Sequence, residues 1–186
     1  EVDTSNIEAV FAQHIQLVPC EDTLGFVYIS LRDLSERKQT GAYYTPEQTV
    51  TTLLNGLRSS CDVEDMTYCD PCCGTGNFLI GLANNGVKVA NIYGQDIDEL
   101  SVLIARINMF LLDDTISIEN LRSHITIGDS LEKSYNSQFS VVLGNPPWGY
   151  NYSKEETMYL LNNYRTAKSK GMESYDLFIE KGLMLL

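Results

Sequence analysis

The turn at residues 145–148, Asn-Pro-Pro-Trp, carries the clearest chemical signal in this sequence. Before it, residues 139–144 form a short, mainly apolar run that predicts a buried strand. Two consecutive prolines cannot continue a strand, because neither has a backbone N–H for the ladder. The turn therefore brings together the Asn145 amide, the Pro146 carbonyl and the Trp148 indole. Two fixed acceptors suit a substrate amino group and an indole suits stacking, although a tight turn with a packing tryptophan is the simpler alternative.

A glycine-rich turn follows the first predicted strand, residues 66–69. It runs over residues 70–79, Asp-Pro-Cys-Cys-Gly-Thr-Gly-Asn-Phe-Leu, and its glycines permit positive φ and a close approach of backbone to ligand. The dinucleotide pattern G-x-G-x-x-G is not met, because Leu79 stands where the third glycine belongs. Asp70 at the strand end suits a ligand with a cationic amine better than it suits a pyrophosphate.

Two more predicted strands end in carboxylates. Residues 87–94 lead to Asp96, at the distance from the glycine turn where a carboxylate can hold ribose hydroxyls. Residues 124–127 lead to Asp129 and Ser130, which could accept an adenine amino group. A solvated loop residue is the simpler interpretation of each aspartate. Together with the Asn-Pro-Pro-Trp turn, however, they describe a nucleoside held beside a pocket for an amino group.

Strand and helix patterns alternate along the chain and predict an α/β fold with a doubly wound, mostly parallel sheet. Right-handed crossovers would bring the carboxyl ends of all the strands to one edge of that sheet. The expected strands are residues 66–69, 87–94, 124–127 and 139–143. Four helices are expected at residues 5–18, 76–83, 154–165 and 175–186. Two more are expected after their capping residues, Thr45 and Asp98. The helix that Thr45 caps carries Val50, Leu53, Leu54 and Leu57 on its apolar face.

Composition limits the classes of function. The 186 residues carry a net charge of −12, which argues against strong nucleic-acid binding by this segment alone. The sequence lacks an apolar run near the ~20 residues of a membrane span. Its five cysteines are irregularly spaced, which favours a reduced, cytoplasmic setting. Cys69-x-x-Cys72 lacks a second cysteine or histidine pair, so no metal site is expected.

From about residue 37 onward, the chain resembles S-adenosylmethionine-dependent DNA adenine-N6 methyltransferases whose methionine-binding motif precedes the catalytic motif. The resemblance rests on residues 41–46 (Gly-Ala-Tyr-Tyr-Thr-Pro), the glycine-rich segment 70–78, Asp96 with Ile97, Asp129 with Ser130, the turn 145–148, and residues 176–178 (Asp-Leu-Phe), which resemble a motif that helps to wall the pocket. Trp148 departs from the commoner Phe or Tyr but preserves stacking.

The resemblance implies S-adenosyl-L-methionine as cofactor and methyl transfer to N6 of a flipped adenine. It implies catalytic roles for Asn145, Pro146 and Trp148, and contacts to the target base from Pro147, Trp148 and Tyr150. The cofactor contacts that it implies are Tyr44, Thr45, Asp70, Cys72, Gly74, Gly76, Asn77, Asp96, Ile97, Asp129, Ser130 and Asn145.

The resemblance also implies a seven-stranded sheet, of which about four strands are expected here. We therefore expect an N-terminal helical segment with the cofactor-contacting motif, residues 1–45, and a truncated catalytic domain, residues 46–186. The whole would be a piece of a type I or type II modification enzyme of a restriction-modification system. It would reach double-stranded DNA through missing C-terminal or partner regions, with a specificity or restriction subunit as a candidate partner. The fourth strand would need the last helix or a second copy beside it.

Three alternatives stay open. The same Asn-Pro-Pro-aromatic motif occurs in methyltransferases that act on RNA or protein. A truncated domain could serve as a cofactor-binding, non-catalytic assembly module. The third is a nicotinamide-dependent oxidoreductase, a function that would not explain the Asn-Pro-Pro-Trp turn.

Overall fold

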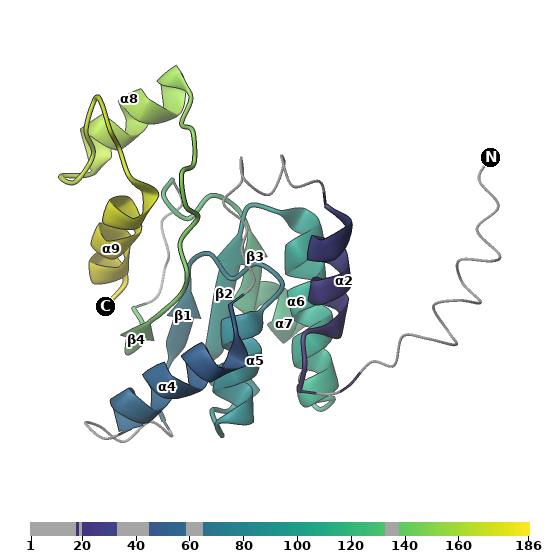
Figure 1. Ribbon diagram of the computed structural model, residues 1–186. Helices are drawn as coiled ribbons and strands as arrows, with labels where there is room; N and C mark the ends of the chain where they lie inside the picture. Colours follow the sequence, from purple (N-terminus) through teal and green to yellow (C-terminus); the bar gives the residue numbers. More distant parts are fainter. Residues whose placement is uncertain (1–17, 19, 33–44, 59–64, 133–137) are drawn as a thin grey trace, which may run out of the picture.

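The computed structural model describes residues 18, 20–32, 45–58, 65–132 and 138–186 of the chain (Figure 1). Its strands are β1 (Tyr68–Asp70), β2 (Ile92–Asp96), β3 (Ile125–Ile127) and β4 (Val141–Val142). Its helices are α2 (Thr23–Leu31), α4 (Glu47–Arg58), α5 (Asn77–Asn84), the 3₁₀ helix η1 (Val89–Asn91), α6 (Glu99–Leu112), α7 (Ile118–His124), α8 (Lys154–Asn163) and α9 (Ser174–Leu185).

The four strands form one sheet in the order β3-β2-β1-β4, and every neighbouring pair is parallel. The predicted α/β fold with a parallel, doubly wound sheet is confirmed. The chain steps outward from β1 through β2 to β3 and then returns to the other side of β1 to form β4. The carboxyl ends of β1 and β4 therefore flank a switch point, which is where open α/β sheets bind ligands.

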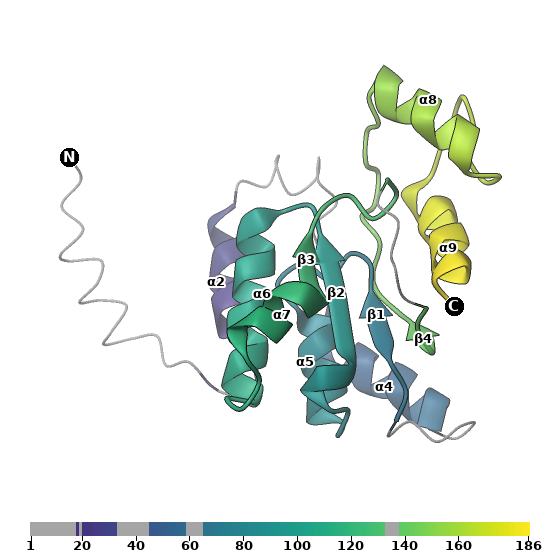
Figure 2. The ribbon, with the colours of Figure 1, turned by 180° about the vertical axis from the view of Figure 1, so that it is seen from behind.

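Helices contact the sheet on both sides, and the front of the sheet is covered more fully than the back (Figure 1 and Figure 2). In Figure 1, α4 and α5 lie in front of it, with α6 and then α2 beside them, and the view from behind brings α7 to the front (Figure 2). The main core joins the sheet to α4, α5 and α6 through side chains such as Val50, Tyr68, Leu79 and Met109. Of the residues predicted on the apolar face of α4, Val50 and Leu54 are buried and Leu57 packs against the core, whereas Leu53 is exposed.

The predicted strand at residues 87–94 begins later than expected. Gly86 turns the chain with a φ of 87°, and the Val87 N–H then bonds to the carbonyl of Leu82 at the end of α5. Val87 and Val89 are both buried. The chain buries them in and just before the 3₁₀ helix η1, so their burial does not require a strand. Regular pairing starts only at Ile92, so β2 begins five residues later than predicted and extends to Asp96.

The end of α9 lies beside the edge strand β4. The Phe139 N–H bonds to the Leu185 carbonyl at 2.8 Å, and both side chains join Cys69 in a small buried cluster. The last helix thus packs on the strand that was expected to need a cover. Only Val141 and Val142 pair as a strand, so β4 is shorter than the predicted 139–143.

Helices α2 and α7 were not predicted, and the predicted helix at residues 5–18 falls almost wholly outside the described residues. So does most of the Gly-Ala-Tyr-Tyr-Thr-Pro motif, including Tyr44. The last two helices match their predicted ranges closely, α8 ending at Asn163 and α9 at Leu185. Within the described ranges, no helix is long and apolar enough to cross a membrane.

Candidate functional site

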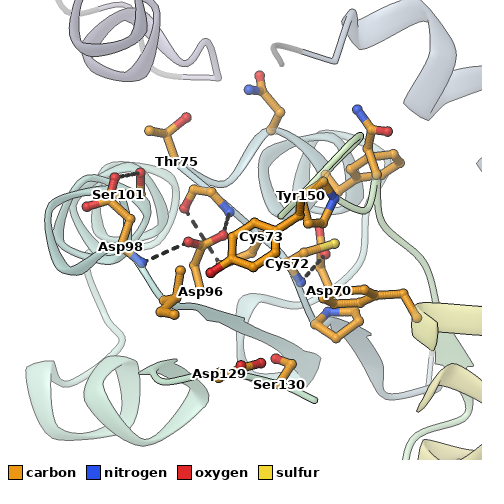
Figure 3. A pocket seen from close by; sticks show the side chains of 18 of the residues that line it. Asp70, Cys72, Cys73, Thr75, Asp96, Asp98, Ser101, Asp129, Ser130 and Tyr150 are labelled. Atoms are coloured by element: carbon orange, nitrogen blue, oxygen red, sulfur yellow. Dashed lines mark hydrogen bonds between the residues drawn. The ribbon is translucent and has the colours of Figure 1, made fainter. Parts of the chain in front are cut away.

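A cavity of about 400 Å³ opens at the carboxyl edge of the sheet, within the range of small-molecule sites. Residues that follow all four strands line it, and Figure 3 shows Asp70, Asp96 and Asp129 around the same hollow. Of the residues predicted to contact cofactor or substrate, the lining includes Thr45, Asp70, Cys72, Gly74, Asn77, Asp96, Ile97, Asp129, Ser130, Asn145, Pro147 and Tyr150. Gly76, Pro146 and Trp148 are not part of the lining, and Tyr44 is not described.

The glycine turn between β1 and α5 depends on two left-handed residues. Gly74 has a φ of 52° and Gly76 a φ of 97°, which other residues rarely adopt. A Cβ at Gly76 would lie 3.2 Å from the Cβ of Ala105 on α6. Gly76 therefore brings α5 against α6, whereas Gly74 lies on the cavity itself.

Asp96 at the end of β2 holds this turn in place. Its Oδ2 accepts the Gly74 N–H at 2.8 Å and its Oδ1 accepts the Asp98 N–H at 2.9 Å, as the dashed lines of Figure 3 indicate. Asp98 caps α6 by accepting the Leu100 N–H, as predicted. Burial raises the pKa of the Asp96 carboxyl, and hydrogen bonds from the backbone of Asp98, Gly74 and Ile97 oppose that rise.

Asp70 at the end of β1 is almost fully buried, with 1% of its surface exposed. Its Oδ1 accepts the Cys72 N–H at 2.9 Å. A Cβ added at Gly144 would collide with that same oxygen, so the chain entering the Asn-Pro-Pro-Trp turn passes directly over Asp70. Burial raises the pKa of Asp70 to about 7, with a smaller contribution from the charge of Asp96.

The end of β3 supplies a third polar wall. Asp129 accepts the Leu131 N–H at 2.8 Å through Oδ1, and Ser130 beside it is buried. Gln95 on β2 fixes the loop before them, because its Nε2 donates to the Gly128 carbonyl at 3.2 Å. The β2 and β3 ends are thus joined below the cavity.

The Asn145 side chain is held from two directions. Its Nδ2 donates to the hydroxyl of Thr45 at 3.3 Å, and its Oδ1 accepts the indole N–H of Trp148 at 3.1 Å. The Trp148 ring is 57% exposed and tilts against Tyr175, with centroids 6.0 Å apart. Thr45, predicted as the helix cap, is buried two residues before α4 begins at Glu47.

The charge of the cavity is predominantly negative. Asp70, Asp96, Asp98 and Asp129 line it, and Arg32 is the one basic side chain among the described lining residues. Arg32 is itself paired, with its Nη1 3.2 Å from Oδ2 of Asp98. The cavity therefore favours a ligand that carries positive charge.

Several lining residues were not predicted from the sequence, including Ile29 on α2, Arg32 directly after α2, and Ser101 on α6. Nothing in the local sequence of α2 marks it as part of a site. Phe178, from the segment predicted to wall the pocket, does line the cavity, while its neighbour Leu177 is buried in the core beneath α8.

Comparison with known sequences decides the family. Residues 20–179 match the family described as N-6 DNA Methylase. The chain belongs to this family. The matched residues include α2 as well as the whole sheet, so the unpredicted N-terminal helix falls within the family match.

Two relatives of this N-6 DNA methylase chain are named as a methyltransferase and as a methylase subunit of a restriction enzyme. The Type II methyltransferase M.VspI of Vibrio sp. (strain 343) is 34% identical over 157 residues, which is 83% of this chain and 37% of M.VspI. The Type I restriction enzyme EcoEI methylase subunit of Escherichia coli is 29% identical over 162 residues, 81% of this chain and 31% of that subunit. This chain thus spans about a third of the length of these relatives.

Among solved structures, a candidate class I S-adenosylmethionine-dependent methyltransferase from Listeria monocytogenes superposes with a TM-score of 0.54. The two are 20% identical, and the match covers 97% of this chain and 48% of the other. This similarity confirms the methyltransferase fold of the sheet and its helices.

Proposed function

We propose that this N-6 DNA methylase chain binds S-adenosyl-L-methionine in the acidic cavity and transfers its methyl group to N6 of a flipped adenine in DNA. One observation carries the proposal. The Asn145 amide stands at the carboxyl end of β4, beside a cavity lined by four carboxylates at the β1–β4 switch point.

The polar side chains that line the cavity fit this cofactor. S-Adenosylmethionine brings a sulfonium and an ammonium group, and its sulfonium supplies an electrophilic methyl. The Asp70 carboxylate and the adjoining glycine turn suit the cationic part, Asp96 suits the ribose hydroxyls, and Asp129 with Ser130 suits the adenine ring. Thr45, Cys72, Gly74, Asn77 and Ile97 complete the proposed contacts, all of them on the cavity lining.

On the substrate side, Asn145 and the Pro146 carbonyl would accept the two N–H bonds of the adenine amino group. That amine is a poor nucleophile because its lone pair is delocalised into the ring. Two fixed acceptors draw the nitrogen toward sp³ and stabilise the positive charge that develops on it during transfer. Near-attack positioning contributes further. The Trp148 N–H occupies one lone pair of Asn145 Oδ1 and leaves the other available.

Base flipping costs a few kcal/mol, which stacking can offset. Trp148 offers an exposed indole, and Tyr150 and Pro147 lie on the lining near it. Aromatic stacking contributes about 1–3 kcal/mol per base. These residues are the proposed floor and wall of the base pocket.

DNA itself requires more basic surface than this chain offers. Its net charge is −12, and it spans about a third of its relatives. We infer that the protein acts in a restriction-modification system, where a further polypeptide region or a specificity subunit supplies the DNA-reading surface. Within this chain, residues 1–45 would carry a cofactor-contacting motif and residues 46–186 the catalytic fold.

A methyl-transfer assay tests the function. The protein, purified from its source with its full natural chain and subunits, would be incubated with tritiated S-adenosylmethionine and separate pools of DNA, RNA and protein. We expect label in DNA, recovered as N6-methyladenine after hydrolysis. Asn145→Ala should abolish it, while Asn163→Ala, an exposed amide on α8, should leave it unchanged. Label confined to RNA or protein, or an active Asn145→Ala, would refute the proposal.

A further inference from the structure

Helix α2 reaches the cofactor cavity from the N-terminal side of the domain. We infer that Asp22, the residue that caps α2, is a positioning residue for the glycine turn of the proposed cofactor site. The inference rests on the proposed function and adds a part of the site that the motifs do not contain.

The Asp22 carboxylate accepts more hydrogen bonds than a helix cap requires. Its Oδ1 accepts the Gly25 N–H of its own helix at 2.9 Å and the Nδ2 of Asn108 at 2.7 Å. Its Oδ2 accepts the hydroxyl of Thr75 and the Nδ2 of Asn77, the latter at 3.2 Å. Asp22 is buried, with 4% of its surface exposed. A buried carboxylate with four donors is therefore anchored to the turn as well as to its helix.

Thr75 and Asn77 belong to the cofactor turn itself, and both line the cavity. Asn108 strengthens the link from α6, because its Nδ2 also donates to the Thr75 carbonyl at 3.0 Å. Thr75 is thus held at both its hydroxyl and its carbonyl. Glycine at positions 74 and 76 allows the backbone on either side of Thr75 many conformations, so these bonds, together with the bond from Gly74 to Asp96, help to fix the turn.

Gly25 shows how closely α2 lies on the turn. A Cβ at this position would collide with both carboxylate oxygens of Asp22 and with the Thr75 hydroxyl oxygen. Glycine at this position therefore lets the first turn of α2 approach Asp22 and Thr75 closely.

The carboxyl end of α2 contacts the loop that follows β2. The Tyr28 hydroxyl donates to Oδ2 of Asp98 at 2.6 Å, and Arg32 is paired with the same oxygen. Asp98 in turn donates its backbone N–H to Asp96, whose other oxygen holds the Gly74 N–H. Helix α2 and its capping residues therefore connect the loop after β1 to the loop after β2. These are the two loops proposed to hold the methionine and ribose parts of the cofactor.

Asp22→Asn is a sharp test because it preserves size. All four partners of Asp22 donate hydrogens, and an amide replaces one acceptor oxygen by an NH₂ group that faces two of those donors. We expect S-adenosylmethionine to bind at least tenfold more weakly, measured by isothermal titration well below the melting temperature of every variant.

Three further variants separate positioning from general stability. Thr75→Val removes the donor to Asp22 and should weaken binding in the same direction, with less than additive loss when combined with Asp22→Asn. Thr75→Ser keeps the hydroxyl and should restore the dissociation constant to within about twofold of wild type. Val87→Ala, in the core below α5, should lower the melting temperature without changing binding.

The outcomes distinguish the two claims. Wild-type affinity in Asp22→Asn, or an equal loss of affinity in Val87→Ala, would contradict the positioning role while leaving the proposed function standing. Absence of binding by the wild-type protein would contradict the proposed function, and the inference would fall with it. If Asp22→Asn does not fold, the contrast between Thr75→Val and Thr75→Ser decides, and equal affinities for these two would overturn the inference.

Discussion

Trp148 donates its indole N–H to Oδ1 of Asn145, three residues earlier in the same turn, at 3.1 Å. The aromatic residue of the Asn-Pro-Pro-Trp turn thus does more than offer a stacking surface. It fixes the orientation of the amide, with the acceptor oxygen turned to Trp148 and the NH₂ group turned to Thr45. A phenylalanine at this position would stack but would leave the amide held from one side only.

The first prediction concerns Trp148→Phe. Loss of the indole donor frees Asn145 to rotate, so we expect kcat for methyl transfer to fall several-fold while the dissociation constant of S-adenosylmethionine stays within twofold. Trp148→Ala should lower kcat further, because it also removes stacking worth about 1–3 kcal/mol. An unchanged kcat in Trp148→Phe would show that the indole bond does not orient the amide.

Gly144→Ala tests the contact between β4 and Asp70. The added Cβ would collide with Asp70 Oδ1, so we expect a loss of about 1–3 kcal/mol in the free energy of unfolding and weaker cofactor binding. Gly56→Ala, on α4 with open space around it, is the matched control and should stabilise by up to about 1 kcal/mol. Denaturant unfolding measures both, and equal stability of the two variants would contradict the close approach.

Asp70 predicts a specific dependence of stability on pH. Its pKa in the fold is raised to about 7, against 3.8 for an unperturbed aspartate, so the fold favours the protonated form. The stability that this proton contributes is fully present below about pH 4 and is lost as the pH rises through 7. Asp70→Asn should therefore be more stable than wild type at pH 8, with the difference shrinking as the pH falls toward 5. Parallel thermal melts across that range would show it, and a difference independent of pH would refute it.

The same carboxyl predicts a pH dependence of binding. A cationic ligand favours the ionised form of Asp70, so cofactor binding should release a proton near pH 7 and weaken as the pH falls below it. Titrations in buffers of different ionisation enthalpy would detect the proton. Asp70→Asn should bind weakly at every pH and release no proton, and a wild-type affinity that is flat between pH 6 and 8 would contradict the assignment.

The positions of the polar residues at the strand ends could be predicted because they depend on short-range patterns. Asp70, Asp96 and Asn145 each follow an apolar segment, and parallel topology alone brings such residues to one edge. The cap of α6 at Asp98 followed from the same reasoning. By contrast, the bond between Trp148 and Asn145 depends on how the turn closes after two prolines, which spacing does not reveal.

The N-terminal wall of the site was missed because α2 gives a weak sequence signal. Its nine residues, Thr-Leu-Gly-Phe-Val-Tyr-Ile-Ser-Leu, are apolar on every side and include β-branched residues and a glycine, which is as typical of a strand as of a helix. The residues that bind its cap, Asp22, are Thr75 and Asn108, which lie 53 and 86 residues away from Asp22 in sequence. Contacts at that separation become visible only in the fold.

Direct titration of the chain with S-adenosylmethionine tests the central claim, with NAD as the rival ligand and Asp96→Ala as the variant. The account predicts saturable heat with S-adenosylmethionine, none with NAD, and at least a tenfold loss of affinity in Asp96→Ala. No heat with S-adenosylmethionine at millimolar concentration, or equal binding of NAD, would contradict it.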